Sequence, residues 1–515
     1  MSRYYVTTAI NYPNGAPHIG HAYEAVATDW LARFARLDGR NVRFLTGTDE
    51  HGLKIAQAAR AAGMSPRAYV DGMVAHFVAM ADALAIARDR FIRTTDPDHV
   101  VAAQALWQRM ADAGDLYLDR YAGWYSVRDE AFYAEDETSL TGDGTRVGPT
   151  GTPVAWLEEE SWFFRLSRFA GPLLELYARR PDFVQPASRM NEMRAFVERG
   201  LKDLSVSRTS FDWGVPVPGS PGHVMYVWVD ALANYLTGAG FPGAGYDRWW
   251  PADLHVIGKD VVRFHAVYWP AFLMSAGLPL PGRIFGHGFI LNRGEKMSKS
   301  AGNIVEPVAL AERFGVDAFR YFLLRAIAFG QDGEWSHEAI VMRVNAELAN
   351  DLGNLAQRTL SMIAKAGGAV PARGEGGEAE ARLLAAAKGL LAACRAAHDA
   401  VRPDLALDAI FAVVAATNLY LSERAPWSLR KTDPAAADSV LWHAAECIRR
   451  IAILLQPAMP ERMARLLNLL SVPETARQFS DLDTELEAGT ELPPPVGLFP
   501  RLEPDQPERM TSQAV

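Results

Sequence analysis

The sequence predicts an α/β protein whose parallel sheet is interrupted by an inserted module and followed by a helical bundle. Residues 4–10 and 42–45 are rich in β-branched and apolar residues, and helical spacing fills 18–37 between them. Strand, helix and strand in this order imply a parallel pair with a right-handed crossover. Residues 115–165, dense in aromatic residues, Gly and Thr, favour short strands, and helical periodicity dominates 308–475.

Composition limits the class of protein. A chain of 515 residues has room for about three domains. Its net charge of −9 gives no support for nucleic-acid binding through bulk charge, so such binding would need a local patch. Cys394 and Cys447 lie in helical runs and are expected to be reduced thiols, although one disulfide is arithmetically possible. The first residues lack a signal-peptide pattern, and no membrane-spanning run is apparent, so we expect a cytoplasmic protein.

The stretch 9–21 forms the predicted turn between the first strand and the first helix. Its Gly, Asn and Pro residues, with Pro17 expected in the first helical turn, leave backbone N–H groups free beside a positive helix end. Such a place binds anions, most often phosphate. His18 and His21 share one helix face, and Gly20 between them lets a flat ligand approach the backbone.

Two other interpretations of this stretch stay open at this point. One is a capped helix with two surface histidines. The other is a metal site, since His18, His21 and Glu24 recur at a spacing of three.

A second polar cluster, 46–52, follows the second strand. Ligands of open α/β sheets bind beyond the carboxyl ends of the strands, so this cluster and 11–21 are expected to face one pocket. Asp49 would supply a negative charge suited to an ammonium group. An ordinary loop with a capping aspartate is the alternative.

The α/β pattern resumes after the inserted module. Residues 224–230 form a strand-like run leading to a predicted helix at 231–236. Residues 254–258 form a further apolar strand, followed by Lys259, which suits a phosphate, and Asp260, which suits ribose hydroxyls.

A basic loop follows within 289–303. Lys296 and Lys299 stand three residues apart among Ser and Gly residues, with little apolar anchoring. A mobile cationic loop of this kind can close over a polyphosphate as a leaving group departs. A plain solvated basic turn has the same composition.

The carboxy-terminal part is predicted to be an antiparallel helical bundle. Helices at 345–366 and 379–400 flank the Gly/Pro-rich connection 367–377, and 406–421 and 439–455 complete it. No catalytic cluster is apparent there, so a binding or supporting role is expected.

Two sequence motifs, taken together, resemble the signature motifs of a known class of enzymes. His18-Ile19-Gly20-His21 and Lys296-Met297-Ser298-Lys299-Ser300 match, in order, both signatures of class I aminoacyl-tRNA synthetases. Within that class the chain resembles the methionyl-tRNA synthetase family from about residue 4 to 503. The stretches that carry this likeness are 12–15, 47–52, 162–167, 226–231, 258–260, 264–265, 347–350, 353–355, 425–427 and 498–503.

The resemblance implies a two-step reaction. Methionine and ATP would form methionyl-adenylate with release of pyrophosphate, and the methionyl group would pass to the 2′-hydroxyl of the terminal adenosine of tRNA(Met), the initiator included. Mg²⁺ would accompany ATP. The catalytic residues implied are His18, His21, Lys296 and Lys299. The ATP-binding residues implied are Gly20, Gly258, Lys259, Asp260 and Lys299.

The resemblance also implies two recognition sites. The methionine pocket would be lined by Ile10, Tyr12, Asp49, Trp228, Ala231, Tyr235, Val261 and His265. Aromatic and aliphatic side chains suit a polarisable thioether. The CAU anticodon would be bound by Asn354, Arg358 and Trp427, whose side chains suit stacking and hydrogen bonding to single-stranded bases.

The domain organisation implied is a split Rossmann-like catalytic domain, an inserted module and a helical anticodon-binding domain. The expected parts are the first catalytic half, the inserted connective module, the second catalytic half, the stem-contact region with the lysine loop, the anticodon-binding domain and a disordered tail, at 1–114, 115–220, 221–283, 284–344, 345–503 and 504–515.

The chain departs from the family pattern in two respects. Many relatives carry zinc knuckles in the inserted module, but Ser126 and Asp129 stand at corresponding positions, so no structural zinc is expected. Some relatives carry an appended dimerisation domain that this sequence lacks, and a monomer is expected.

Three rival functions remain to be weighed. One is a synthetase for another apolar amino acid, although an insertion of about 100 residues leaves little room for the large editing domain of the Leu, Ile and Val enzymes. Another is a tRNA-binding protein without catalysis, which the intact motifs oppose. The third is the metalloenzyme built on His18, His21 and Glu24.

Overall fold

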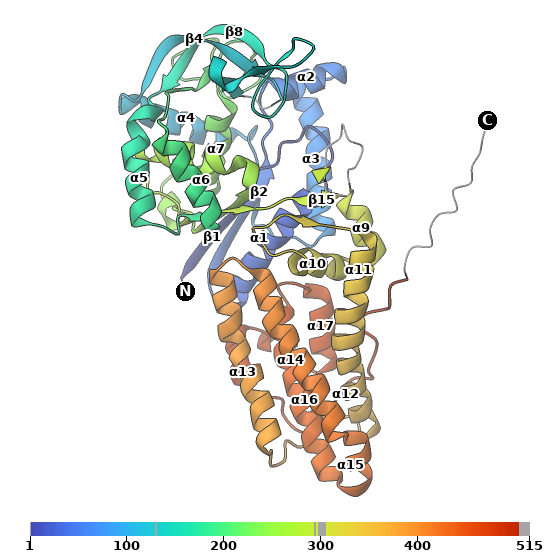
Figure 1. The fold of residues 1–515 in the computed structure, drawn as a ribbon. Helices are drawn as coiled ribbons and strands as arrows, with labels where there is room; N and C mark the ends of the chain where they lie inside the picture. Colours follow the sequence, from blue (N-terminus) through green and yellow to red (C-terminus); the bar gives the residue numbers. More distant parts are fainter. Residues whose placement is uncertain (1, 129–130, 293–294, 297–304, 504–515) are drawn as a thin grey trace, which may run out of the picture.

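The computed structural model describes residues 2–128, 131–292, 295–296 and 305–503. Figure 1 shows an α/β part that carries the inserted β module on one side and an elongated helical bundle on the other. The described chain thus has the three parts that the sequence predicts.

A parallel sheet forms the centre of the α/β part. Its strand order is β3-β2-β1-β13-β14-β9, and every neighbouring pair is parallel. Val6 of β1 lies opposite Leu254 of β13, so segments nearly 250 positions apart are adjacent. The strands are Arg3–Thr8 (β1), Asn41–Thr48 (β2), Arg90–Arg93 (β3), Val184–Gln185 (β9), Leu254–Gly258 (β13) and Arg283–His287 (β14). The split parallel sheet is therefore confirmed.

The inserted module is built on a four-stranded antiparallel sheet of order β10-β8-β4-β5. Its two long strands have 11 and 10 residues, so the strands are longer than expected. One part of 115–220 belongs elsewhere, because β9 pairs with β14 in the central sheet. The strands of this region are β4 (Leu116–Ser126), β5 (Ala131–Tyr133), β6 (Ser139–Leu140), β7 (Arg146–Val147), β8 (Ala155–Phe164), β10 (Leu204–Ser205), β11 (Ser207–Arg208) and β12 (Val224–Met225).

Helices cover both faces of the central sheet. One face carries α1, whose buried side chains join the same hydrophobic cluster as the bundle, and the other carries α4, α7 and α8 within a second cluster. The helices of this part are α1 (Ile19–Leu37), α2 (Leu53–Ala61), α3 (Pro66–Ala83), α4 (Pro97–Asp112), α5 (Ala170–Arg179), α6 (Ala187–Glu198), α7 (Val227–Ala239) and α8 (Trp269–Ser275).

The expected strand over 224–230 is wrong. Only Val224–Met225 is extended, and α7 begins at Val227. Nearly every residue of α7 is buried, so apolar residues surround the helix on all sides and leave no amphipathic period to distinguish it from a buried strand. Gly238 allows the close approach of this helix to the sheet, since a Cβ there would lie 2.3 Å from the Tyr5 hydroxyl. Trp228 therefore belongs to the first helical turn.

A small sheet connects the α/β part to the bundle. Its order is β16-β15-β17, from Glu295–Lys296, Ile290–Asn292 and Gly333–Glu334. The last of these lies inside the region that the sequence predicts to be almost wholly helical. It is accompanied by α9 (Pro307–Phe314), α10 (Val316–Arg325) and α11 (His337–Arg343).

The bundle contains the four expected helical segments and two shorter helices. A π-helix, Val344–Gly353, leads into α12 (Asn354–Lys365), so the first expected segment is a π-helix continued by an α-helix. The remaining helices are α13 (Glu378–Asp399), α14 (Pro403–Arg424), α15 (Pro426–Thr432), α16 (Pro434–Leu455) and α17 (Pro460–Leu469). Both cysteines are buried and unlinked.

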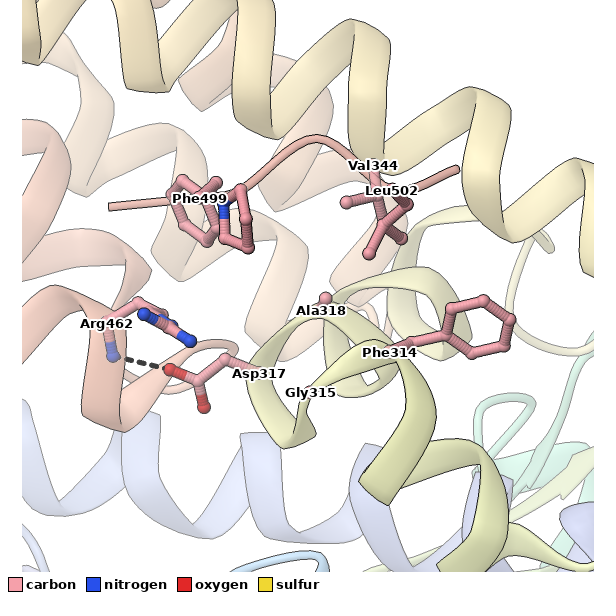
Figure 2. A pocket seen from close by; sticks show the side chains of 9 residues that line it. Phe314, Gly315, Asp317, Ala318, Val344, Arg462, Phe499 and Leu502 are labelled. Atoms are coloured by element: carbon pink, nitrogen blue, oxygen red, sulfur yellow. Dashed lines mark hydrogen bonds between the residues drawn. The ribbon is translucent and has the colours of Figure 1, made fainter. Parts of the chain in front are cut away.

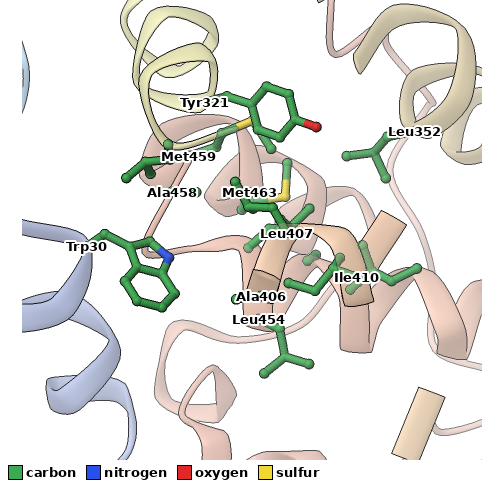
Figure 3. Packing of buried hydrophobic residues seen from close by; sticks show 14 of the residues in the cluster. Trp30, Tyr321, Leu352, Ala406, Leu407, Ile410, Leu454, Ala458, Met459 and Met463 are labelled. Carbon is green, nitrogen blue, oxygen red and sulfur yellow. The ribbon is translucent and has the colours of Figure 1, made fainter. Parts of the chain in front are cut away.

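One stretch, Pro403–Thr432, is long and apolar enough to span a membrane by length and composition alone. It consists of α14 and α15, separated by Ala425 in a left-handed conformation. Half of its apolar window is buried inside the protein. Leu407 and Ile410 belong to the hydrophobic core of the bundle, as Figure 3 shows, and this packing accounts for the apolar composition.

The segment that ends the described chain packs back along the bundle. Asn345 exchanges two hydrogen bonds of 2.8 Å with the backbone of Leu502. A cavity of about 30 Å³ lies beneath this segment (Figure 2), where Asp317 accepts the backbone N–H of Arg462 at 2.5 Å and so caps α17.

A buried ion pair joins the first helix to the bundle. The guanidinium of Arg320 on α10 is fully buried and donates to the Asp29 carboxylate of α1 at 2.7 Å. It also donates to three carbonyl oxygens, those of Leu84, Pro457 and Ala458, at 2.9, 2.9 and 3.1 Å. One side chain therefore ties the central sheet's first helix to the connection between α16 and α17.

We expect Arg320→Met to lower the free energy of unfolding by about 3 kcal/mol or more, because three carbonyl oxygens lose the Arg320 donor and the buried Asp29 keeps only Arg33 and the Ala87 N–H. Urea unfolding at pH 7 measures this. Arg395→Ala is the matched control, since Arg395 also pairs with an aspartate, Asp38 at the end of α1, but is 53% exposed. The control substitution should lower the free energy of unfolding by at most about 1 kcal/mol. Equal losses for the two variants would contradict the role given to Arg320.

Candidate active site

The two predicted polar clusters lie side by side at the carboxyl ends of β1 and β2. Asn11 donates its N–H to the Gly47 carbonyl at 2.8 Å, and the Asp49 N–H donates to the Asn11 carbonyl at 2.9 Å. The strand order reverses between β1 and β13, because the chain proceeds from β1 to β2 on one side and from β13 to β14 on the other. Such a switch point is where open α/β sheets bind ligands.

The two histidines of the first motif cap α1. Nδ1 of His18 accepts the Gly20 N–H at 3.1 Å, and Nδ1 of His21 accepts the His18 N–H at 3.0 Å. The helix therefore begins at Ile19, and Pro17 precedes the cap rather than lying in the first turn as expected. The two imidazole rings stack with centroids 3.9 Å apart.

This capping arrangement defines the chemistry of both rings. Because each Nδ1 accepts a backbone N–H, a neutral imidazole carries its proton on Nε2. Two N–H donors therefore accompany a positive helix end, which is an arrangement suited to phosphate oxygens. Gly20 leaves space for the His18 ring, since a Cβ there would lie 2.8 Å from it.

Glu24, the third member of the metal alternative, is engaged elsewhere. Its carboxylate lies 2.8 Å from Nε2 of the buried His287 on β14. Burial alone would lower the pKa of His287, but the hydrogen bond and charge of Glu24 raise it above its ordinary value. Glu24 thus ties α1 to the central sheet. Within 2–128, 131–292, 295–296 and 305–503, no group of three or more His, Cys, Asp and Glu side chains could hold a metal.

A chain of hydrogen bonds fixes the polarity of the predicted methionine pocket. Nδ1 of His265 lies 2.9 Å from the Val261 carbonyl and donates to it, so Nε2 accepts the Tyr235 hydroxyl at 2.7 Å. Burial lowers the pKa of His265 to about 4 and raises that of Tyr235, so both side chains are neutral near pH 7. The pocket wall therefore offers aromatic surface without net charge.

The other predicted pocket residues gather at the same place. Ile10, Tyr12, Trp228 and Val261 are partly buried and pack against the cluster that contains Tyr235. Asp49 and Ala231 are buried nearby, one after β2 and the other on α7. The Tyr12 hydroxyl donates to the His51 carbonyl at 3.2 Å.

Phe264 packs against Trp228, one of the residues of the predicted methionine pocket, although the sequence predicted no role for it. Its ring stacks on Trp228 with centroids 3.7 Å apart and planes 6° from parallel. It lies in the π-helix Phe264–Tyr268 that precedes α8. Its place beside His265 was a weak signal, because successive residues of a helix point in different directions.

Asp230 holds the two sides of the pocket together. Its fully buried carboxylate lies 2.6 Å from Nδ1 of His51 and 2.6 Å from Nε2 of His99. Burial raises the pKa of Asp230, but the charges and hydrogen bonds of His51 and His99 outweigh this and bring it to about 2. His51 lies two residues after Asp49, and Asp230 directly precedes Ala231. The contact between His51 and Asp230 therefore fixes the distance between the Asp49 segment and α7, the two sides of the predicted pocket.

The glycine turn after β13 holds Gly258, Lys259 and Asp260 as predicted. A Cβ at Gly258 would lie 2.7 Å from the Asp260 carboxylate, so a larger residue there would require that side chain to move. Lys259 does not stand alone, because its Nζ lies 2.6 and 2.8 Å from the two carboxylate oxygens of Asp332. No sequence motif pointed to Asp332. Lys299 and the side chain of Lys296 lie outside the described residues.

The predicted anticodon-binding residues come together at the end of the bundle far from the sheet. Asn354 and Arg358 are exposed on α12, and the Arg358 guanidinium lies 5.4 Å from the centre of the Trp427 ring. Trp427 lies in the first turn of α15, the helix at the far end in Figure 1, and is 44% exposed. An exposed tryptophan beside an arginine is suited to stacking with unpaired bases.

One of the two positions discussed for zinc is described. The Ser126 hydroxyl is buried and lies 2.9 Å from the Thr152 hydroxyl, so a small polar contact occupies this place in the inserted module. Asp129 lies outside the described residues.

Comparisons with known proteins agree with the geometry. The family described as "tRNA synthetases class I (M)" matches residues 4–360, and "Anticodon binding domain of methionyl tRNA ligase" matches 370–514. The methionine–tRNA ligase of Brucella suis is 58% identical over 97% of this chain and 98% of its own length, and that of Mycobacterium bovis is 59% identical over 98% and 99%.

Solved structures extend the likeness to three dimensions. The Mycobacterium tuberculosis methionyl-tRNA synthetase in complex with methionyl-adenylate is 59% identical and gives a TM-score of 0.95 over 97% of this chain and all of that one. The free state of that protein, at 55% identity over 98% and 99%, gives 0.87. A split parallel sheet with a histidine-capped first helix, matched over the whole catalytic part, defines a class I tRNA synthetase.

This chain belongs to the methionyl branch of that class, the methionine–tRNA ligases. The family resemblance, the fold class and the helical anticodon-binding domain inferred from the sequence are thereby confirmed.

We expect Asp230→Asn to lower the free energy of unfolding at pH 7 by about 2 kcal/mol, the value of a pKa displaced from 3.8 to about 2. Because the folded-state pKa is depressed, this stability is complete above about pH 4 and is lost as the pH falls towards 2. The difference between the two proteins should therefore shrink over that range in acid titrations followed by circular dichroism.

The control for this prediction is Asp98→Asn, which removes a 56% exposed carboxylate paired with Arg90. This substitution should lower the free energy of unfolding by less than about 1 kcal/mol. The Asp230 variant should also bind methionine more weakly, whereas the control should not. A stability difference for Asp230→Asn that stays constant from pH 5 to pH 2 would contradict the assigned charge.

Proposed function

We propose that this chain ligates L-methionine to tRNA(Met) in two steps. Methionine and ATP form methionyl-adenylate and pyrophosphate, and the methionyl group then passes to the 2′-hydroxyl of the terminal adenosine. The single observation that carries the proposal is the His18–His21 cap of α1 beside an uncharged aromatic pocket at one switch point. The Mycobacterium tuberculosis relative, bound to methionyl-adenylate, supports it.

The first step needs no nucleophile from the protein. A methionine carboxylate oxygen attacks the α-phosphorus of ATP, the bond to the bridging oxygen breaks, and pyrophosphate leaves with the electron pair. The protein positions the two substrates and stabilises the charge that develops. The Nε2–H groups of His18 and His21 donate to the phosphate oxygens, and the lysines of the second motif approach the departing pyrophosphate.

Adenosine would lie over the turn after β13. Gly20 and Gly258 allow a close approach to the backbone, and Asp260, which is exposed, accepts from ribose hydroxyls. Mg²⁺ is proposed to enter with ATP, held mainly by phosphate oxygens, as is usual for this ion. It would supply additional charge neutralisation on the phosphates.

Methionine specificity is proposed to come from the neutral pocket. The Asp49 carboxylate binds the ammonium group, and the thioether lies among Tyr12, Trp228 and Tyr235, with Ile10, Ala231, Val261 and His265 completing the wall. Because His265 donates to Val261 and accepts from Tyr235, its ring keeps one orientation. A fixed aromatic and aliphatic wall favours a thioether over a charged side chain.

The bundle is proposed to bind the anticodon of tRNA(Met), the initiator included, through Asn354, Arg358 and Trp427. The contact between Arg358 and Trp427 supports a site for stacked bases. We further propose a monomer that needs no structural zinc and acts in the cytoplasm. Size-exclusion chromatography with light scattering and metal analysis of the purified protein test the first two points.

Amino-acid-dependent ATP–pyrophosphate exchange, measured with each of the twenty amino acids in turn, tests the activity. Methionine alone should support rapid exchange. Exchange driven by leucine, isoleucine, valine or cysteine instead would assign the chain to a different specificity. No exchange with any amino acid, together with tight tRNA binding, would indicate a binding protein without catalysis.

We expect Lys299→Ala to slow adenylate formation by roughly tenfold to a hundredfold, because a cation near the departing pyrophosphate is lost. Methionine affinity without ATP, measured by isothermal titration calorimetry, should stay within about twofold. Lys365→Ala, at the end of α12, removes a lysine far from the sheet and should change neither quantity. Unchanged pyrophosphate exchange in the Lys299 variant would exclude its proposed role.

We expect Trp427→Ala to lower kcat/KM for tRNA in aminoacylation by roughly tenfold, the size of one lost base stack. Pyrophosphate exchange without tRNA should be unaffected, because the residue lies at the far end of the bundle. Leu419→Ala, which truncates a 59% exposed side chain on α14, is the control. Equal effects of Trp427→Ala on exchange and aminoacylation would point to a folding defect.

A further inference from the structure

Asp332 is the partner of Lys259 in this structure. Both carboxylate oxygens of Asp332 accept from the Lys259 ammonium, at 2.6 and 2.8 Å, and Oδ1 also accepts the Phe289 N–H at 2.8 Å. Burial raises the pKa of Asp332, but the bonds from Lys259 and Phe289 outweigh this and leave it below its ordinary value. The carboxylate is therefore ionised and accepts three hydrogen bonds near pH 7.

These contacts join two different sheets. Lys259 directly follows β13 of the central sheet, whereas Phe289 and Asp332 directly precede β15 and β17 of the small sheet. Gly333 donates its N–H to the Phe289 carbonyl at 2.9 Å. Gly288 lies so close to this crossing that a Cβ would stand 2.1 Å from the Gln331 carbonyl oxygen. The two segments thus form one rigid unit held to the central sheet by Lys259.

The small sheet leads directly into the second sequence motif. β15 pairs with β16 in antiparallel register, which places the backbone of Lys296 opposite Leu291. The direction in which the chain enters the lysine motif is therefore set by β15. The Lys259–Asp332 contact lies at the start of that strand.

Lys259 would have to give up several interactions to bind a phosphate directly. Its ammonium holds both oxygens of Asp332 and lies 4.5 Å from the centre of the Phe289 ring. Its charge is already neutralised by a carboxylate, so it adds little positive field to the nucleotide site. The interaction geometry is that of a structural tie between sheets.

We propose that the ion pair of Lys259 and Asp332, called the strut below, positions the base of the lysine motif relative to the nucleotide-binding edge of the central sheet. In this role Lys259 acts through Asp332 and is not a phosphate ligand. This inference rests on the proposed function and changes the role that the family resemblance implies for Lys259. Asp332 becomes a positioning residue for adenylate formation.

A strut and a phosphate ligand differ in how the two residues depend on each other. If Lys259 acts through Asp332, loss of either side chain has the same consequence, and loss of both adds nothing further. If Lys259 binds phosphate and Asp332 merely competes for it, removing Asp332 frees the lysine and leaves ATP binding unchanged or tighter.

A double-mutant cycle with Lys259→Met, Asp332→Asn and the double variant tests the strut. The rate of methionine-dependent pyrophosphate exchange is measured at saturating methionine over a range of ATP concentrations. Each single variant should lower the maximal rate by roughly twofold to fivefold, the range for an ion pair whose carboxylate is 41% exposed, with KM for ATP changed less than about twofold. The double variant should be no slower than the singles.

Two controls accompany the cycle. Glu334→Gln removes an exposed carboxylate two positions along the same segment and should leave the exchange rate unchanged. Lys259→Arg, which can contact both oxygens of Asp332, should restore most of the rate. Thermal unfolding of every variant separates slower chemistry from partial unfolding.

Three results would overturn the strut. One is a rise in KM for ATP in Lys259→Met with no loss in Asp332→Asn. Another is a loss of exchange rate in the double variant that equals the product of the losses in the two single variants. The third is slow pyrophosphate exchange in a Lys259→Arg variant that folds normally. Absence of methionine-dependent exchange in the unaltered protein would instead contradict the proposed function, so the two failures are distinguishable.

Discussion

The parallel pairing of β1 with β13 is the constraint on which the site depends. Val6 lies opposite Leu254, and the Asp253 carboxylate accepts the Tyr5 N–H at 2.7 Å beside this ladder. The whole inserted module lies between these strands in sequence, yet their pairing brings the histidine-capped helix and the Gly258 turn to one crevice. Without this register, the two halves of a nucleotide site would have no common edge.

Carboxylates buried or partly buried between elements then fix the geometry around the crevice. Asp230 joins the two sides of the proposed methionine pocket, Glu24 ties α1 to β14, and Asp29 links α1 to the bundle through Arg320. Asp332 connects the central sheet to the strand leading into the lysine motif. Apolar packing tolerates small shifts, whereas a buried ion pair loses much of its energy when its geometry changes, so the buried pairs of Asp230, Glu24 and Asp29 favour one arrangement.

Local patterns predicted much of this. The spacing of His18 and His21 indicated a shared helix face, and the strand–turn order placed Lys259 and Asp260 at a sheet edge. The strand expected over 224–230 was wrong because α7 is buried on all sides, so its apolar run had no helical period. The role of Asp332 could not be predicted from the sequence, because a single acidic residue in a Gly-containing turn has no local signature. Its partner, Lys259, is 73 positions away.

By itself the sequence determined the family and the fold class, and it predicted the residue types at the proposed site, because motifs and periodicity are local properties of the chain. Only the tertiary structure decided how these residues act. It showed that His18 and His21 present Nε2 because both Nδ1 atoms cap the helix, and that His265 is oriented by Tyr235 and Val261. Tautomers, ion-pair partners and burial depend on contacts between distant segments, and such contacts exist only after the sheets and helices have packed.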